Sequence, residues 1–232
     1  MTPITTLLGN DARNALRDRT IGALLFVPLI FLVLLRFGFP LLRDHVPAAG
    51  DYAGTALSLF CGIAAAFPAF MMAFLMLDER DQHVVAVLRV LPMPWGRIIA
   101  YRAAAVTLVG MANSALLIFG SGLNTHSVAG ALLLSALSAL VAPTALLLVV
   151  SWAGNKIEGL TLFKGLFFVL FLAAAAQSVT SEWRFVLGVV PPFWTYSALA
   201  ETTAFSFIGT VGISLLTHLA AIGLAARRII RS

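Results

Sequence analysis

Residues 103–155, AAAVTLVGMANSALLIFGSGLNTHSVAGALLLSALSALVAPTALLLVVSWAGN, contain no Lys, Arg, Asp or Glu. An α-helix crosses the hydrocarbon core of a bilayer with about 20 apolar residues. This stretch is long enough for two such helices, and the polar interruption at residues 120–127 (GSGLNTHS) supplies the turn between them. The stretch therefore predicts a helical hairpin inside a membrane.

Similar runs occur on both sides of this hairpin. Residues 52–77, 165–181 and 202–226 also lack charged side chains, and an apolar run from residue 20 continues until Arg36. Only 11% of the chain is charged, against about 25% in soluble domains. We expect an all-α polytopic membrane protein with one six-helix transmembrane domain, residues 21–232. The expected spans are 21–42, 53–77, 98–122, 128–153, 160–179 and 203–226.

The distribution of basic residues orients these spans. Twelve of the fifteen Lys and Arg residues fall on one side, and only Arg36, Arg43 and Arg184 fall on the other. Because basic residues concentrate in cytoplasmic loops, we expect both termini to lie inside the cell. The twelve residues on the inner side are Arg13, Arg17, Arg19, Arg80, Arg89, Arg97, Arg102, Lys156, Lys164, Arg227, Arg228 and Arg231.

Two further segments are expected at the membrane surfaces. Residues 1–20 alternate apolar and charged side chains at helical spacing, which indicates an amphipathic interfacial helix or a solvated lead-in to the first span. Residues 180–201 are external, aromatic and broken by Pro191–Pro192. We expect short helices that dip into the outer leaflet as a re-entrant external cap, with Trp183, Phe193 and Trp194 as its main side chains.

The sequence offers little for catalysis. It has no phosphate-binding loop, no paired Cys or His at metal-ligand spacing, and one cysteine, Cys61. We therefore expect no enzyme, no cofactor and no metal on this chain. The basic residues at span ends indicate contact with lipid, not with nucleic acid. Asn113, Gln177 and His218 are polar residues within spans; they are candidates for a transport pathway or are hydrogen-bonded ties between helices.

The cytoplasmic loop at residues 78–97 is the largest on the inner side. It opens with Asp78, Glu79, Arg80 and Asp81 and continues as a short amphipathic helix that ends at Pro92. The apolar side chains of this helix are Val84, Val87, Leu88 and Leu91. An exposed apolar helix face needs a partner to cover it, whereas a solvated loop without a partner is the alternative.

This loop resembles that of ABC-2 type transporter permeases, in which a Glu begins the loop, a proline turn follows and a basic residue precedes the next helix. Glu79, Leu91–Pro92 and Arg102 occupy those places. Within the family, the chain looks most like small bacterial drug-export permeases, including those for fluoroquinolones.

The resemblance implies the transmembrane subunit of an ATP-driven exporter in the bacterial inner membrane. It would move a lipophilic or amphipathic substrate outward, paired with a second permease, identical or homologous. ATP and Mg²⁺ would bind separate ATP-binding subunits, onto which the loop at 78–97 would dock. The alternatives are a membrane scaffold without transport and a proton-coupled carrier that uses His218.

The orientation is open to a direct test in a Cys61→Ala background. Cysteines placed at Asn124 and Glu182 should react with an impermeant thiol reagent added to intact cells. Cysteines placed at Gln82 and Lys156 should react only after the cells are opened. The reverse pattern of labelling would overturn the orientation inferred from the basic residues.

Overall fold

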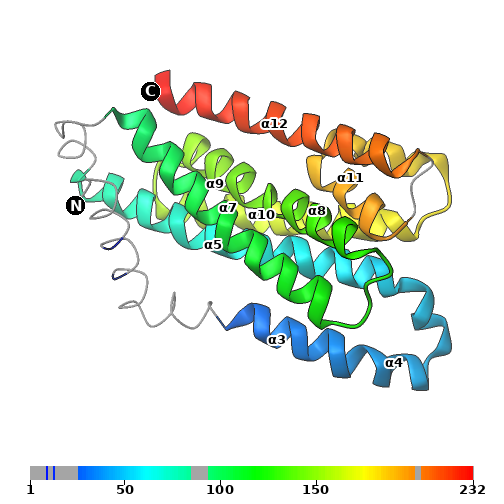
Figure 1. Ribbon diagram of the computed structural model, residues 1–232. Coiled ribbons are helices and arrows are strands. Elements are labelled where there is room, and N and C mark those ends of the chain that lie inside the picture. The colour runs from blue at the N-terminus through cyan, green and yellow to red at the C-terminus, as the bar shows by residue number, and fades with distance from the viewer. Residues whose placement is uncertain (1–8, 10–12, 14–25, 85–93, 202–204, 232) are drawn as a thin grey trace.

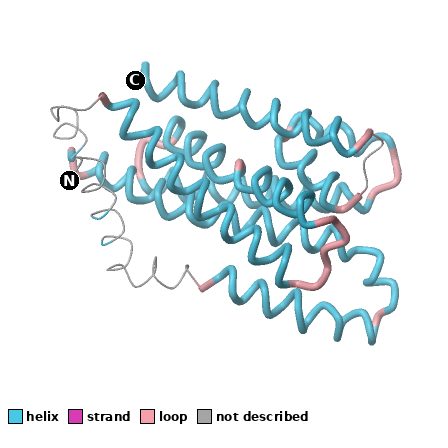
Figure 2. Tube along the Cα trace, viewed as in Figure 1, coloured by secondary structure: helices cyan, strands magenta, loops and turns pink. Residues whose placement is uncertain are grey.

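The computed structural model describes residues 9, 13, 26–84, 94–201 and 205–231. Within these ranges every regular element is helical (Figure 2), which confirms the predicted all-α class. Most of the expected interfacial helix at residues 1–20 lies outside the described residues. So do residues 85–93 of the cytoplasmic loop, which include the predicted docking residues Val87, Leu88, Leu91 and Pro92.

Five helical segments are long and apolar enough to cross a membrane, and they correspond to the second through sixth expected spans. They are Pro47–Asp81, Trp95–Gly120, Val128–Trp152, Lys156–Ser178 and Phe207–Ile229. The first expected span, 21–42, begins outside the described residues. Its described part is one helical run made of α3 (Val27–Val33), the π-helix η1 (Leu34–Gly38) and α4 (Phe39–His45). That this run crosses the membrane stays a prediction.

The long helices lie side by side along one direction (Figure 1). After the 3₁₀ turn η2 (Pro47–Tyr52), they are α5 (Ala53–Asp81), α7 (Trp95–Gly120), α8 (Val128–Ala139), α9 (Val141–Trp152), α10 (Lys156–Ala175) and α12 (Phe207–Arg231). The end of α5 and the starts of α7 and α10 share one end of the bundle with the C-terminus. Consecutive long helices from α5 onward, with α8 and α9 counted as one, therefore run in opposite directions.

The fourth expected span is two helices joined at Leu140. Pro143 has no N–H to donate to the carbonyl of the preceding turn, which interrupts the hydrogen-bond ladder. The ladder resumes at the next residue, where the Thr144 backbone N–H and hydroxyl both donate to the Leu140 carbonyl, at 3.2 and 2.7 Å. The chain therefore continues through the proline as α9.

Helix α5 supplies the small residues on which the core is built. Cys61, Ala64, Ala65, Ala69 and Ala73 are completely buried. Small side chains let helix backbones approach closely, which is how helices gain contact energy in lipid. At the crossing with α7, a methyl group on Gly110 would lie 3.3 Å from the Ala65 carbonyl oxygen, so there is little space between the two helices.

The segment before α12 folds back into the bundle. The 3₁₀ helix η3 (Ala176–Ser178) ends α10, and two short helices follow, η4 (Glu182–Val189) and α11 (Pro191–Leu199). Ala200 contacts Gly54 at the start of α5, whereas the Tyr196 hydroxyl fills the space over Gly62. These two glycines are about 12 Å apart along a helix axis. Helix α11 thus starts deep between the other helices and rises toward the end of the bundle at which α5 begins.

This arrangement differs in one respect from a cap that lies against lipid. Most side chains of α11 are buried, Phe193 and Tyr196 among them. The deep N-terminus of α11 would normally leave several N–H groups without partners. Pro191 and Pro192 occupy its first two positions and have no N–H. The next donor, Phe193 N–H, bonds to the Val190 carbonyl at 3.0 Å. The prolines are therefore what permits a helix end at this depth.

Replacing Pro192 with Ala should destabilise the protein, because it creates an N–H in apolar surroundings. The expected loss is about 1–3 kcal/mol. The matched control is Pro47→Ala, because Pro47 also begins a short helix but is exposed, so water can hydrate the new N–H. Thermal unfolding in detergent, followed by near-ultraviolet circular dichroism, measures both. Equal effects of the two substitutions would contradict this account.

Candidate functional site

Four consecutive charged residues end α5, and the first of their contacts is a buried ion pair. Glu79 accepts two hydrogen bonds from the Arg102 guanidinium, at 2.6 Å each. The Arg102 side chain is 1% exposed and that of Glu79 is 15% exposed. The Tyr101 hydroxyl accepts a third bond from Arg102 Nε at 3.2 Å. The pair joins the end of α5 to the first turns of α7, on the two sides of the cytoplasmic loop.

Arg80 binds the end of a different helix. Its guanidinium donates to the carbonyls of Ala153, at 2.6 Å, and Val150, at 3.1 Å. These carbonyls close α9, and the C-terminal carbonyls of a helix have no partners within it. The helix dipole places partial negative charge there, so a cation is favourable. Arg80 therefore attaches α9 to α5.

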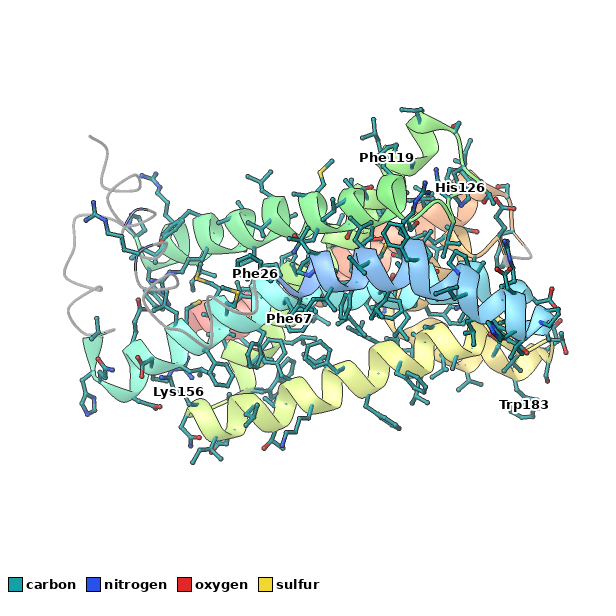
Figure 3. The ribbon with its side chains drawn as sticks, turned by 90° about the horizontal axis from the view of Figure 1, so that it is seen from below. Phe26, Phe67, Phe119, His126, Lys156 and Trp183 are labelled. Atoms are coloured by element: carbon teal, nitrogen blue, oxygen red, sulfur yellow. The ribbon has the colours of Figure 1, made fainter. Side chains whose placement is uncertain are left out.

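Asp78 and Asp81 both reach the start of α10. Asp78 forms an ion pair with Lys156 Nζ at 2.6 Å, and the Lys156 backbone N–H donates to Asp81 Oδ2 at 3.3 Å. Carboxylates are favourable beside a helix N-terminus. Figure 3 shows Lys156 at one extreme of the bundle, opposite Trp183. This pair is partly exposed and contributes little on its own.

The charged junction, as we call Asp78, Glu79, Arg80 and Asp81, thus connects α5 to α7, α9 and α10. The sequence suggested these side chains as ion-pair partners for another subunit, but in the structure each has a partner within the chain. Val84 is the one predicted apolar docking residue that is described, and it packs on buried Ile98. The other three predicted apolar docking residues, Val87, Leu88 and Leu91, lie outside the described residues, so the docking role stays a prediction.

The pathway candidates also form bonds within the chain. Asn113 donates to the Ala64 carbonyl of α5 at 3.0 Å. Gln177 donates to the Phe193 carbonyl at 3.3 Å and accepts from the Ser197 hydroxyl at 2.8 Å, so it holds α11 against the end of α10. These bonds favour the interpretation of both side chains as ties between helices.

His218 belongs to a buried polar row on α12 with Thr210 and Ser214, all 0% exposed. The His218 Nδ1 atom lies 2.9 Å from the Ser214 carbonyl, and the Ser214 hydroxyl lies 2.6 Å from that of Thr195 on α11. His218 Nε2 is buried without a hydrogen-bond partner in the structure. Of the three pathway candidates, His218 alone has a buried side-chain polar atom without a hydrogen-bond partner.

The residues of the expected cap have different environments. Trp183 is 81% exposed, Phe193 is fully buried, and Trp194 is partly buried with its indole N–H bonded to the Gly188 carbonyl at 2.7 Å. Trp194 also stacks on Phe185, with ring centroids 6.2 Å apart. Trp194 therefore holds η4 and α11 together, and only Trp183 has the freedom to lie among headgroups.

Two features were not anticipated from the sequence. An apolar cavity of about 220 Å³ lies between α9, α10 and the start of α11, with Ala66, Phe163 and Pro191 among its lining. At the end of the bundle opposite the charged junction, Glu201 has the unusual φ of 52° and accepts a hydrogen bond from Thr125 at 2.7 Å, with His126 Nδ1 3.7 Å away. The cavity and the contacts of Glu201 are both formed by residues far apart in sequence, so no local sequence pattern predicts them.

Among the described residues, no group of three His, Cys, Asp or Glu side chains could hold a metal ion. The cavity is apolar apart from Thr144, whose hydroxyl already donates to the Leu140 carbonyl. Its chemistry suits an uncharged hydrocarbon group. The arrangement as a whole is a bundle with one charged junction at an end and a re-entrant helix at the other.

Glu79→Gln should destabilise the protein strongly, because it leaves the Arg102 charge buried with a weaker partner. The expected loss is about 3 kcal/mol. Asp78→Asn removes one carboxylate from the same junction, but its pair with Lys156 is partly exposed, and about 1 kcal/mol or less is expected. Thermal unfolding in detergent compares the two. If they lower the midpoint alike, the Glu79–Arg102 pair is not a dominant contact.

Comparison with known proteins identifies a family and two relatives of this chain. The family model for fluoroquinolones export permease proteins like Rv2686c matches residues 11–226. Two fluoroquinolones export permease proteins of Mycobacterium tuberculosis, MT2760 of strain CDC 1551 and Rv2686c of strain H37Rv, are each 29% identical over 199 residues. That alignment covers 82% of this chain and 78% of each relative. No solved structure matches. The chain is therefore a multi-pass membrane permease that belongs to the Rv2686c-like family of fluoroquinolone export permeases.

Proposed function

We propose that this chain is the transmembrane subunit of an ATP-driven exporter that moves an amphipathic drug, of the fluoroquinolone kind, outward across the bacterial inner membrane. The family and the names of the two relatives support export of a drug. ATP and Mg²⁺ would bind separate ATP-binding subunits, and a second permease, identical or homologous, would complete the pathway.

The charged junction is the observation that carries this proposal. Residues 85–93 connect the end of α5 to the start of α7, and the Glu79–Arg102 pair holds those two points together. A force applied to the loop would move both helices as one body. Because Arg80 and Lys156 attach α9 and α10 to the same point, the movement would spread to four helices.

The same movement would reach the outer end through α5. The re-entrant helix α11 rests on α5 at Gly62 and at Gly54, where contact leaves no room for a methyl group. A tilt of α5 would therefore displace α11 and the segment with Trp183, Phe193 and Trp194. In this mechanism the cap opens last and releases the cargo outside.

His218 is the pathway residue that we favour. It lies on the buried polar row of α12 that contacts α11 through Ser214 and Thr195, so displacement of α11 would expose that row. Asn113 and Gln177 would keep the helices in register while this occurs. The cargo would thus meet a polar surface only in the open state.

Leu88→Asp tests the docking of the loop. Co-expressed with its ATP-binding partner, the variant should insert into the membrane but lose co-purification and stimulated ATP hydrolysis. Gln82→Glu is the matched control, because it adds the same charge at the exposed end of α5 without removing an apolar side chain. Drug accumulation in whole cells provides the transport measurement.

Retention of both co-purification and stimulated hydrolysis by Leu88→Asp would show that the loop is not the docking site. Loss of both by Gln82→Glu as well would show that charge near the loop, and not the apolar face, decides binding. Unchanged drug accumulation when the whole chain is deleted would contradict the export function itself.

A further inference from the structure

Arg36 occupies an unusual place on the outer half of the bundle. It lies at the centre of the π-helix η1, a form that is rare and often marks a functional position. Its neighbours Val33, Leu34 and Phe37 are 55%, 47% and 63% exposed. In a membrane protein such a surface faces lipid. Arg43, which begins the charged end of α4, lies about 10 Å farther along the helix.

The Arg36 guanidinium is directed at the turn between α7 and α8. A methyl group built on Gly122 would overlap Arg36 Nη1, and Gly122 has a φ of 75°, which favours glycine. This turn also holds the polar residues Ser121, Asn124 and Thr125. It is therefore the polar protein surface nearest to Arg36 beyond the exposed apolar side chains around it. Gly122 thus provides the space that fixes the guanidinium at this level.

The structure shows no carboxylate that neutralises Arg36 among the described residues. Glu201, on the same end of the bundle, is engaged by Thr125 and His126. An arginine near the end of a span extends its guanidinium to the headgroup level, where lipid phosphates are the available anions. A guanidinium matches the geometry of phosphate oxygens and binds them in pairs.

We propose that Arg36 and the turn at Gly122 form a binding site for the phosphate of an anionic phospholipid in the outer leaflet. The exposed apolar side chains Val33 and Phe37 would contact the acyl chains below the phosphate. A free anion gains nothing from those side chains, so an amphiphile fits the surface better. The bound lipid would join the first helical run to the α7–α8 turn, two elements that are distant in sequence.

Native mass spectrometry of the purified full-length chain tests this site with phosphatidylglycerol as the probe. Arg36→Gln should weaken phosphatidylglycerol binding about fivefold. Gly122→Ala should do the same, since it displaces the guanidinium and leaves the charge in place. Arg43→Gln is the matched control, because it removes an exposed outer arginine from the same helical run and should leave the bound lipid unchanged. Arg36→Lys should keep part of the affinity.

Several results would overturn the proposal. An equal loss of phosphatidylglycerol binding in Arg43→Gln would mean that binding depends only on the net charge of the protein. Equal binding of phosphatidylcholine or of inorganic phosphate at the site would rule out an anionic lipid as its ligand. A shift of Arg36→Gln from dimer to monomer, with lipid binding unchanged, would assign Arg36 to a carboxylate of a second permease.

Discussion

Close approach of helices to α5 is the constraint on which the rest of this structure depends. In lipid, apolar side chains gain nothing from leaving the solvent, so helices associate through packing and hydrogen bonds. The alanines and Gly62 of α5 let α7, α9 and α11 come close enough for both packing and hydrogen bonding. The Asn113 bond to the Ala64 carbonyl shows how short the distance is. A bulkier residue on this face would separate the elements that the proposed mechanism moves together.

The two ends of α5 then acquire different chemistry. Its inner end extends beyond the apolar span by about one turn, where Asp78 to Asp81 project in several directions and meet separate helices. Its outer half instead presents small residues to a re-entrant element. In the proposed mechanism, strong charge-assisted contacts at the charged junction transmit the movement to α5. Van der Waals contacts between α5 and α11 transmit it further, and a small displacement is enough to break them.

The sequence predicted the parts of the structure that depend on local composition. Charge-free runs gave the second through sixth spans, and Pro191–Pro192 correctly indicated a broken element before the last helix. The contacts inside the bundle were harder to predict from the sequence. Glu79 and Arg102 were both singled out, yet their pairing depends on how α5 and α7 pack, 23 residues apart. The apolar cavity and the contacts of Glu201 likewise join segments that no local periodicity connects.

The prolines at the start of α11 also bear on how the protein is made. Nine residues in a helix are too few to enter a membrane as an independent span. The segment between α10 and α12 would therefore reach its place only after the neighbouring helices have assembled. Because Pro191 and Pro192 leave no donors to be stripped of water, this late insertion meets a low desolvation barrier. Biogenesis of the transporter would end with α11, the same element that we expect to open in its working cycle.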